Sequence, residues 1–103
     1  MTDQDPRHAA LTRRLALVVD VSALNAEALR LTQALAGIEM EVLRIELDMR
    51  KTSSTGQLVQ DLHEAHEKAG TIQTARAECE ERIVATEQEI EKVDHLLAGM
   101  NSG

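Results

Sequence analysis

The chain has 103 residues, a net charge of −7, and no Phe, Tyr or Trp. A globule of this size normally fills its core with a few aromatic rings, so a composition restricted to Leu, Ile, Val, Ala and Met favours narrow seams between helices. Nucleic-acid binding needs a basic footprint and often stacking aromatics, and the chain has 11 Lys and Arg against 18 Asp and Glu. Composition therefore argues against a nucleic-acid partner and for one small helical domain.

The N-terminal residues 1–5 are polar and are expected to be disordered. Asp5 followed by Pro6 predicts an N-cap and a proline in the first helical position. Pro6 is the only proline, so a long helix over residues 6–51 meets no proline break. The longest apolar run, Leu15 to Val19, is too short to span a bilayer.

A loop is predicted at residues 52–56, where Thr, Ser and Gly cluster. Ser54 with Gln57 three residues later forms a capping-box pattern, which predicts a second helix over residues 57–98. Gly99 is expected to end that helix and leave residues 99–103 as a disordered tail. An alternative breaks the second helix at Gly70 and gives three helices, but the apolar spacing passes through Gly70 without a phase change.

Apolar residues alternate at steps of three and four in both predicted helices, which is the a/d pattern of a coiled coil. This seam includes Val21, Leu24, Leu31, Leu35, Ile38, Val42, Ile45, Leu62, Ile72, Ile83, Ile90 and Val93. A five-residue turn between helices of equal length predicts an antiparallel hairpin, with Leu35 opposite Ile72 and Leu24 opposite Ile83. The expected fold class is all-α: a helical hairpin or coiled coil that assembles into a helical bundle.

Two polar residues, Arg76 and Thr86, interrupt the seam. Polar groups at such positions can fix register or partner choice at a cost in stability. We therefore expect Arg76 and Thr86 to act in register or specificity.

The first predicted helix carries a second apolar stripe, here named the outer stripe: Leu29, Ala36, Met40, Leu43 and Leu47. At about 100° per residue, the outer stripe lies about 150° from the seam. A two-helix hairpin can cover only one of the two, and soluble proteins avoid large exposed apolar patches. The stripe therefore predicts a protein partner, either a second copy in a homo-oligomer, with a dimer preferred, or a hetero-oligomeric helical complex. The alternative is a chain that folds as three helices and buries both stripes.

Few residues of the chain are candidates for metal binding or catalysis. His63, His66 and Glu67 share a helical face, but they match neither the zinc-protease pattern nor the paired motifs of di-iron bundles. Cys79 has acidic neighbours, which disfavour a reactive thiolate, and as the single cysteine it forms no internal disulfide and fits a reducing compartment. We expect no metal, no cofactor and no catalytic residues, and therefore no enzyme.

These features predict a non-enzymatic coiled-coil interaction module, cytoplasmic, that self-associates or joins a larger helical complex through its first helix as a structural or adaptor subunit. The alternative is a small helical chaperone that covers a partner protein during assembly. Residues 52–103 hold four Lys or Arg against ten Asp or Glu, so this half could also face a basic partner. The molecular mass of the protein in solution distinguishes these two functions, because a scaffold is expected to be a stable homo-oligomer and a chaperone a monomer.

Overall fold

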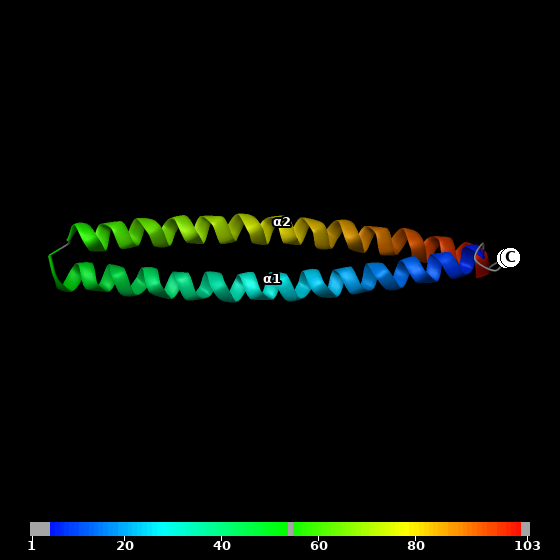
Figure 1. The fold of residues 1–103 in the computed structure, drawn as a ribbon, viewed down its shortest axis with the longest axis horizontal. Coiled ribbons are helices and arrows are strands. Elements are labelled where there is room, and N and C mark those ends of the chain that lie inside the picture. The colour runs from blue at the N-terminus through cyan, green and yellow to red at the C-terminus, as the bar shows by residue number, and fades with distance from the viewer. Residues whose placement is uncertain (1–4, 54, 102–103) are drawn as a thin grey trace. The chain divides into compact units, whose positions relative to one another are not determined.

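A computed structural model describes residues 5–53 and 55–101 of the chain. It contains two helices packed against each other, α1 (Pro6–Lys51) and α2 (Gly56–Asn101), and the described residues include no strand (Figure 1). The prediction of an all-α helical hairpin is confirmed. The chain divides into two compact units, each built from a part of both helices. The terminal unit comprises residues up to Glu27 and from Cys79, and the turn unit comprises Ala28–Glu78.

Helix α1 has the bounds expected from its sequence. The Asp5 carboxylate accepts a hydrogen bond from the backbone N–H of Arg7 at 3.0 Å, which satisfies one of the free amides of the first turn. At the other end, the backbone N–H of Thr52 donates to the carbonyl oxygen of Asp48, and the Thr52 hydroxyl donates to the same atom at 2.9 Å. Side chains next to the helix therefore cap both of its ends.

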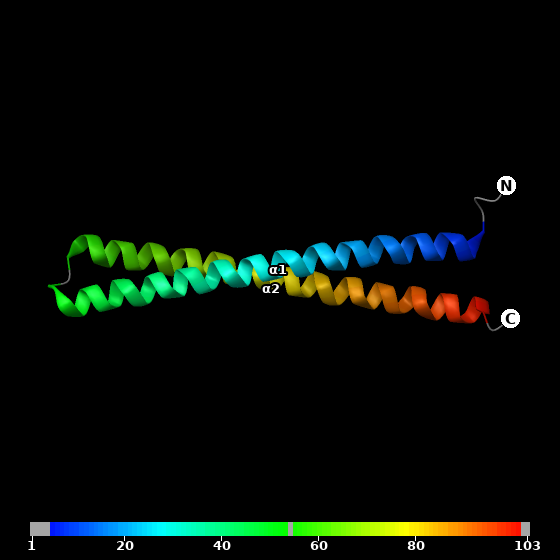
Figure 2. The same ribbon diagram turned by 90° about the horizontal axis from the view of Figure 1, so that it is seen from below.

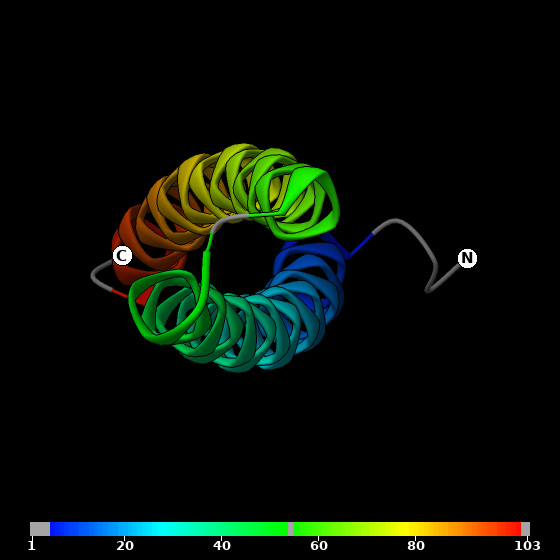
Figure 3. The same ribbon diagram turned by 90° about the vertical axis from the view of Figure 1, so that its left-hand side faces the viewer.

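Helix α2 begins at Gly56, one residue before the predicted start. The Thr55 hydroxyl accepts a hydrogen bond from the Leu58 backbone N–H at 3.2 Å, so Thr55 caps the helix. The predicted capping box rests on Ser54, which lies outside the described residues. Figure 3 views the turn unit from the end where α1 stops and α2 starts.

The predicted stop at Gly99 is wrong, because α2 continues to Asn101. A glycine stop needs a left-handed backbone, and none of the described glycines has a positive φ. Burial favours the extension of the helix over residues 99–101, because Met100 packs against the cluster formed by Ala10, Leu17 and Val93. The helix also runs unbroken through Gly70, so the three-helix alternative with a break there is not what the structure shows.

Each unit has its own apolar core between α1 and α2. In the terminal unit, Ile90, Leu97 and Met100 pack against the buried cluster of Ala10, Leu17 and Val93. The start of α1 and the end of α2 lie next to each other there (Figure 2). In the turn unit the buried side chains are Leu31, Leu35, Ile45 and Ala65, and Ile45 is only 2% exposed.

Polar contacts across the terminal unit report the register of its two helices. The Arg7 guanidinium donates to Asn101 Oδ1 at 2.6 Å, and Arg14 Nε donates to Asp94 Oδ1 at 2.6 Å. Arg14 follows Arg7 by the same number of residues as Asp94 precedes Asn101, so the two pairs share one antiparallel register. That register lies within one residue of the predicted pairing of Leu24 with Ile83.

Candidate interaction surface

The outer stripe lies on α1 in the turn unit, and its side chains are open to solvent. Leu29 is 59% exposed, Met40 72%, Leu43 60% and Leu47 49%, and Ala36 is also exposed. Their spacing along one helix places all five on a single face. The structure therefore places the predicted interface residues on one uncovered face of α1, which the exposed Gln33 interrupts between Leu29 and Ala36.

The seam behaves in the opposite way. Leu31, Leu35, Ile45 and Val93 are buried, and the other eight predicted seam residues are half-buried. In the turn unit, α2 covers the seam face of α1 and leaves the outer stripe uncovered. The alternative in which the chain buries both stripes on itself is therefore not the observed arrangement.

Sequence reasoning missed the exposed apolar residues on α1 in the terminal unit, of which Leu15 at 66% and Val19 at 59% are the most exposed. Stepping back from Leu29 by alternating three and four residues reaches Ala26, Ser22, Val19 and Leu15 in turn. The same spacing that defines the outer stripe could have found both residues. In the sequence they lie at the two ends of the apolar run Leu15 to Val19, which is too short to cross a bilayer.

Charged residues follow the outer stripe on both flanks. Glu39 and Glu46 lie on one side, and Arg44 and Lys51 lie on the other, as the helical spacing requires. The Arg44 guanidinium is 3.6 Å from Glu41 and 3.6 Å from Asp48 within the same helix, and its side chain is 64% exposed. Exposed pairs at this distance contribute little, about 0.3–0.5 kcal/mol.

The two polar residues predicted to set register are both half-buried. Thr86 donates its hydroxyl to the Arg82 carbonyl oxygen at 2.7 Å, which is a bond within its own helix. The hydroxyl is therefore satisfied without a contact to α1. Arg76 lies in the turn unit, beside the seam residue Ile72 and three residues before the buried Cys79.

The Cys79 side chain is 5% exposed, and its thiol donates to the Leu24 carbonyl oxygen at 3.2 Å. A buried thiol with a weak hydrogen bond packs as a small apolar side chain. Cys79 therefore belongs to the core of the terminal unit.

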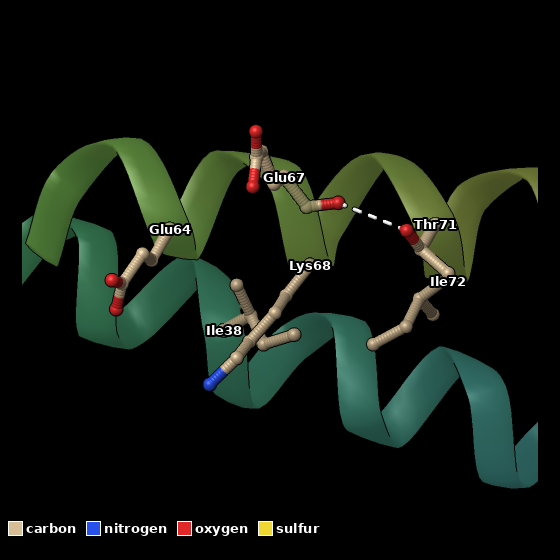
Figure 4. A pocket seen from close by; sticks show the side chains of 6 residues that line it. All are labelled: Ile38, Glu64, Glu67, Lys68, Thr71 and Ile72. Atoms are coloured by element: carbon tan, nitrogen blue, oxygen red, sulfur yellow. Dashed lines mark hydrogen bonds between the residues drawn. The ribbon is translucent and has the colours of Figure 1, made fainter. Parts of the chain in front are cut away.

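An open groove of about 410 Å³ lies in the turn unit, lined by Ile38, Glu64, Glu67, Lys68, Thr71 and Ile72. Figure 4 shows Lys68 reaching from α2 over Ile38, while Thr71 donates its hydroxyl to the Glu67 backbone carbonyl at 3.1 Å. The apolar floor is formed by the seam residues Ile38 and Ile72, with charged side chains around it. The groove is the edge of the seam and carries no set of convergent catalytic groups.

The histidines considered as metal ligands lie on the solvent side of α2. His63 Nε2 is 3.1 Å from Glu67 Oε1, and these two side chains are 66% and 68% exposed. His66 is also exposed. Among the described residues, no group of three or more His, Cys, Asp or Glu is arranged to hold a metal ion.

Electrostatics are clearest in the terminal unit, where Arg14 and Asp94 form an ion pair on its surface. The hydrogen bond from Arg14 lowers the pKa of Asp94 below its ordinary value of 3.8, and the same bond raises the pKa of Arg14. Arg13 lies 3.8 Å from Glu89 and adds a second, longer pair between the helices. Both pairs cross between α1 and α2 on the surface of the terminal unit, where exposed ion pairs contribute little to stability.

Over the described residues, neither helix has a stretch that is both long and apolar enough to cross a bilayer. Comparison with protein-family models, curated proteins and solved structures finds no match to the chain. The class that the fold defines is a helical hairpin with one apolar face left uncovered. That uncovered face is the feature of the molecule that bears on its function.

Proposed function

We propose that this chain is a non-enzymatic helix-binding module, a structural or adaptor subunit that self-associates through the outer stripe of α1. One observation carries the proposal: Leu29, Met40, Leu43 and Leu47 are between 49% and 72% exposed. Burying side chains of this type stabilises an assembly by roughly 1.5–3 kcal/mol each. A contiguous apolar surface of this kind on a soluble protein marks an interaction site.

The small core of the hairpin supports the same proposal. Among the described residues, Ile45 is the most deeply buried large side chain, at 2% exposed. The other buried side chains are 5–8% exposed. Small domains bury a low fraction of their surface and commonly gain stability by oligomerisation. A further helix on the outer stripe would give α1 apolar contacts on two opposite faces.

Sedimentation equilibrium of three proteins tests the proposal: wild type, Leu43→Asp and Val59→Asp. Val59 is 52% exposed and lies on α2 in the same turn unit, so it is a matched control for adding a charge at an exposed apolar site. We expect the wild type and Val59→Asp to be oligomers, with a dimer preferred. Leu43→Asp should be a folded monomer, because its carboxylate would have to be desolvated in the interface.

Circular dichroism at matched concentration shows whether each variant keeps its helices. A wild type that remains a folded monomer at every concentration contradicts self-association. Equal association of Leu43→Asp and wild type places the interface elsewhere. A helical chaperone would use the same stripe while remaining monomeric in the absence of its client, so the same measurement separates the two functions.

A further inference from the structure

The order of charges beside the outer stripe indicates which helix covers it and in which direction. In heptad terms, Met40 and Leu47 occupy a positions, and Leu29, Ala36 and Leu43 occupy d positions. All five side chains are exposed in the turn unit. The outer stripe therefore has the spacing of a second coiled-coil seam, and α2 does not cover it.

The flanking e and g positions separate by charge. Between Leu29 and Lys51, the g positions are Thr32, Glu39 and Glu46. The e positions are Arg30, Gly37, Arg44 and Lys51. Every charged g residue is thus acidic and every charged e residue is basic, and such charges set partner choice and orientation in coiled coils.

We propose that the partner is a second copy of this chain whose α1 pairs with the first in parallel and in register. In a parallel pair, each g residue faces the e residue five positions further along the other helix. Glu39 then faces Arg44 of the second copy, and Glu46 faces Lys51. Two-fold symmetry forms each of these attractive pairs twice. The inference rests on the proposed function, because it identifies what covers the outer stripe.

An antiparallel pair brings g against g and e against e. Glu39 and Glu46 would then face each other across the interface, and Arg44 would face Lys51. Like charges in such positions are destabilising by about as much as opposite charges stabilise. The charge pattern is therefore self-complementary in the parallel orientation and self-repulsive in the antiparallel one.

Two further residues are compatible with this pairing. The Arg44 guanidinium lies 3.6 Å from Glu41 and 3.6 Å from Asp48 on its own helix. Because it has five N–H donors, it can donate to one more carboxylate. Gln33 is exposed and occupies an a position between Leu29 and Ala36. In register it faces its own copy, where one amide can donate to the other, and a polar a residue of this kind fixes register.

The main test exchanges the flanking charges in one chain: Glu39→Lys, Glu46→Lys, Arg44→Glu and Lys51→Glu together. All four side chains are exposed, and the net charge of the chain is unchanged. The exchanged chain, carrying a mass tag, is mixed with wild type, and the species are counted by native mass spectrometry. Parallel pairing predicts that each chain pairs with itself, with mixed dimers roughly tenfold below their statistical share.

The other outcomes overturn the inference in distinguishable ways. Mixed dimers in excess indicate antiparallel pairing, because acidic g residues would then face basic g residues, and the proposed function would still stand. A statistical mixture shows that the flanking charges do not set orientation. If neither chain associates, self-association itself is wrong.

Disulfide cross-linking tests register independently of charge. Leu29→Cys and Leu47→Cys are made separately in a Cys79→Ser background, with Val59→Cys as control. Parallel in-register pairing places each new cysteine opposite its own copy, within the short Cα separation that a disulfide needs. We expect both variants to form covalent dimers on mild oxidation and the control to remain monomeric under denaturing conditions. No antiparallel register places both positions opposite themselves, so cross-linking of one variant alone contradicts the inference.

Discussion

The terminal unit and the turn unit join the same two helices by different contacts. In the terminal unit, charged and polar side chains reach from α1 to α2: Arg14 contacts Asp94 at 2.6 Å, and Arg7 contacts Asn101 at 2.6 Å. Its buried cluster is formed by Ala10, Leu17 and Val93. The exposed polar pairs follow the register of the two helices in this unit and contribute little to its stability.

In the turn unit, the buried side chains are Leu31, Leu35, Ile45 and Ala65, and Ile45 is only 2% exposed. Its Arg44 contacts carboxylates of its own helix, and its His63 contacts Glu67 of its own helix. The exposed face of α1 in this unit carries the outer stripe, with Glu39 and Glu46 along one side and Arg44 and Lys51 along the other. Polar side chains thus cross between the two helices in the terminal unit, whereas one apolar face of α1 is uncovered in the turn unit.

The largest change in stability is expected from truncating the core of the turn unit. Ile45→Ala removes a side chain that is 2% exposed and should lower the free energy of unfolding by about 2–5 kcal/mol. Val93→Ala in the terminal unit should cost less, because it removes fewer carbon atoms from a site that is 8% exposed. Urea unfolding at one fixed chain concentration measures both. If Val93→Ala lowered the free energy of unfolding as much as Ile45→Ala or more, the expectation that the core of the turn unit contributes more stability would be wrong.

A smaller change of opposite sign is expected at Gly70. A Cβ at this position meets nothing within 4 Å, and alanine is favoured over glycine inside a helix by about 1 kcal/mol. Gly70→Ala should therefore raise the melting temperature. Gly99→Ala, equally free of contacts but two residues from the end of α2, should raise it less because helix ends fray. A lower melting temperature for Gly70→Ala would show that the turn unit needs a flexible point there.

The smallest effect concerns the surface ion pair of the terminal unit. The pKa of Asp94 is lowered in the folded chain, so this pair contributes stability above the unfolded pKa, and the contribution is lost as pH falls through the folded value. Asp94→Asn should slightly lower the melting temperature at neutral pH and have no effect once the pH is below the folded pKa. In an Arg14→Gln background the substitution should have little effect at either pH. A pH-independent loss would assign Asp94 a role other than this pair.

Much of the fold follows from the sequence because its signals are local and regular. An unbroken alternation of three and four with no proline after Pro6 requires long helices, and the polar cluster at residues 52–56 places the turn. The end of α2 could not be placed in this way. Gly99 is a good helix stop in isolation, but Met100 reaches the buried cluster that includes Val93, and this tertiary contact outweighs the local preference.

The candidate surface was also partly visible in the sequence. Spacing alone placed Leu43 and its neighbours opposite the seam, and their exposure agrees with that placement. The hydrogen bond from the Thr86 hydroxyl to the Arg82 carbonyl oxygen lies within α2 and could not be predicted from the seam spacing. Leu15 and Val19 required the stripe to be followed beyond Leu29, where Ser22 and Ala26 weaken its apolar character.

The most direct test of the central claim is the solvent accessibility of the Met40 methyl group as the protein is diluted. Met40 is 72% exposed in the single chain and lies in the middle of the outer stripe, while Met49 is half-buried and provides an internal reference. Relaxation of the methyl NMR signals by a soluble paramagnetic probe reports this accessibility. If a second copy covers the stripe, Met40 should be shielded at high concentration and become accessible on dilution, with little change at Met49. A Met40 methyl that is fully accessible at every concentration, in a chain that remains helical, would contradict the claim.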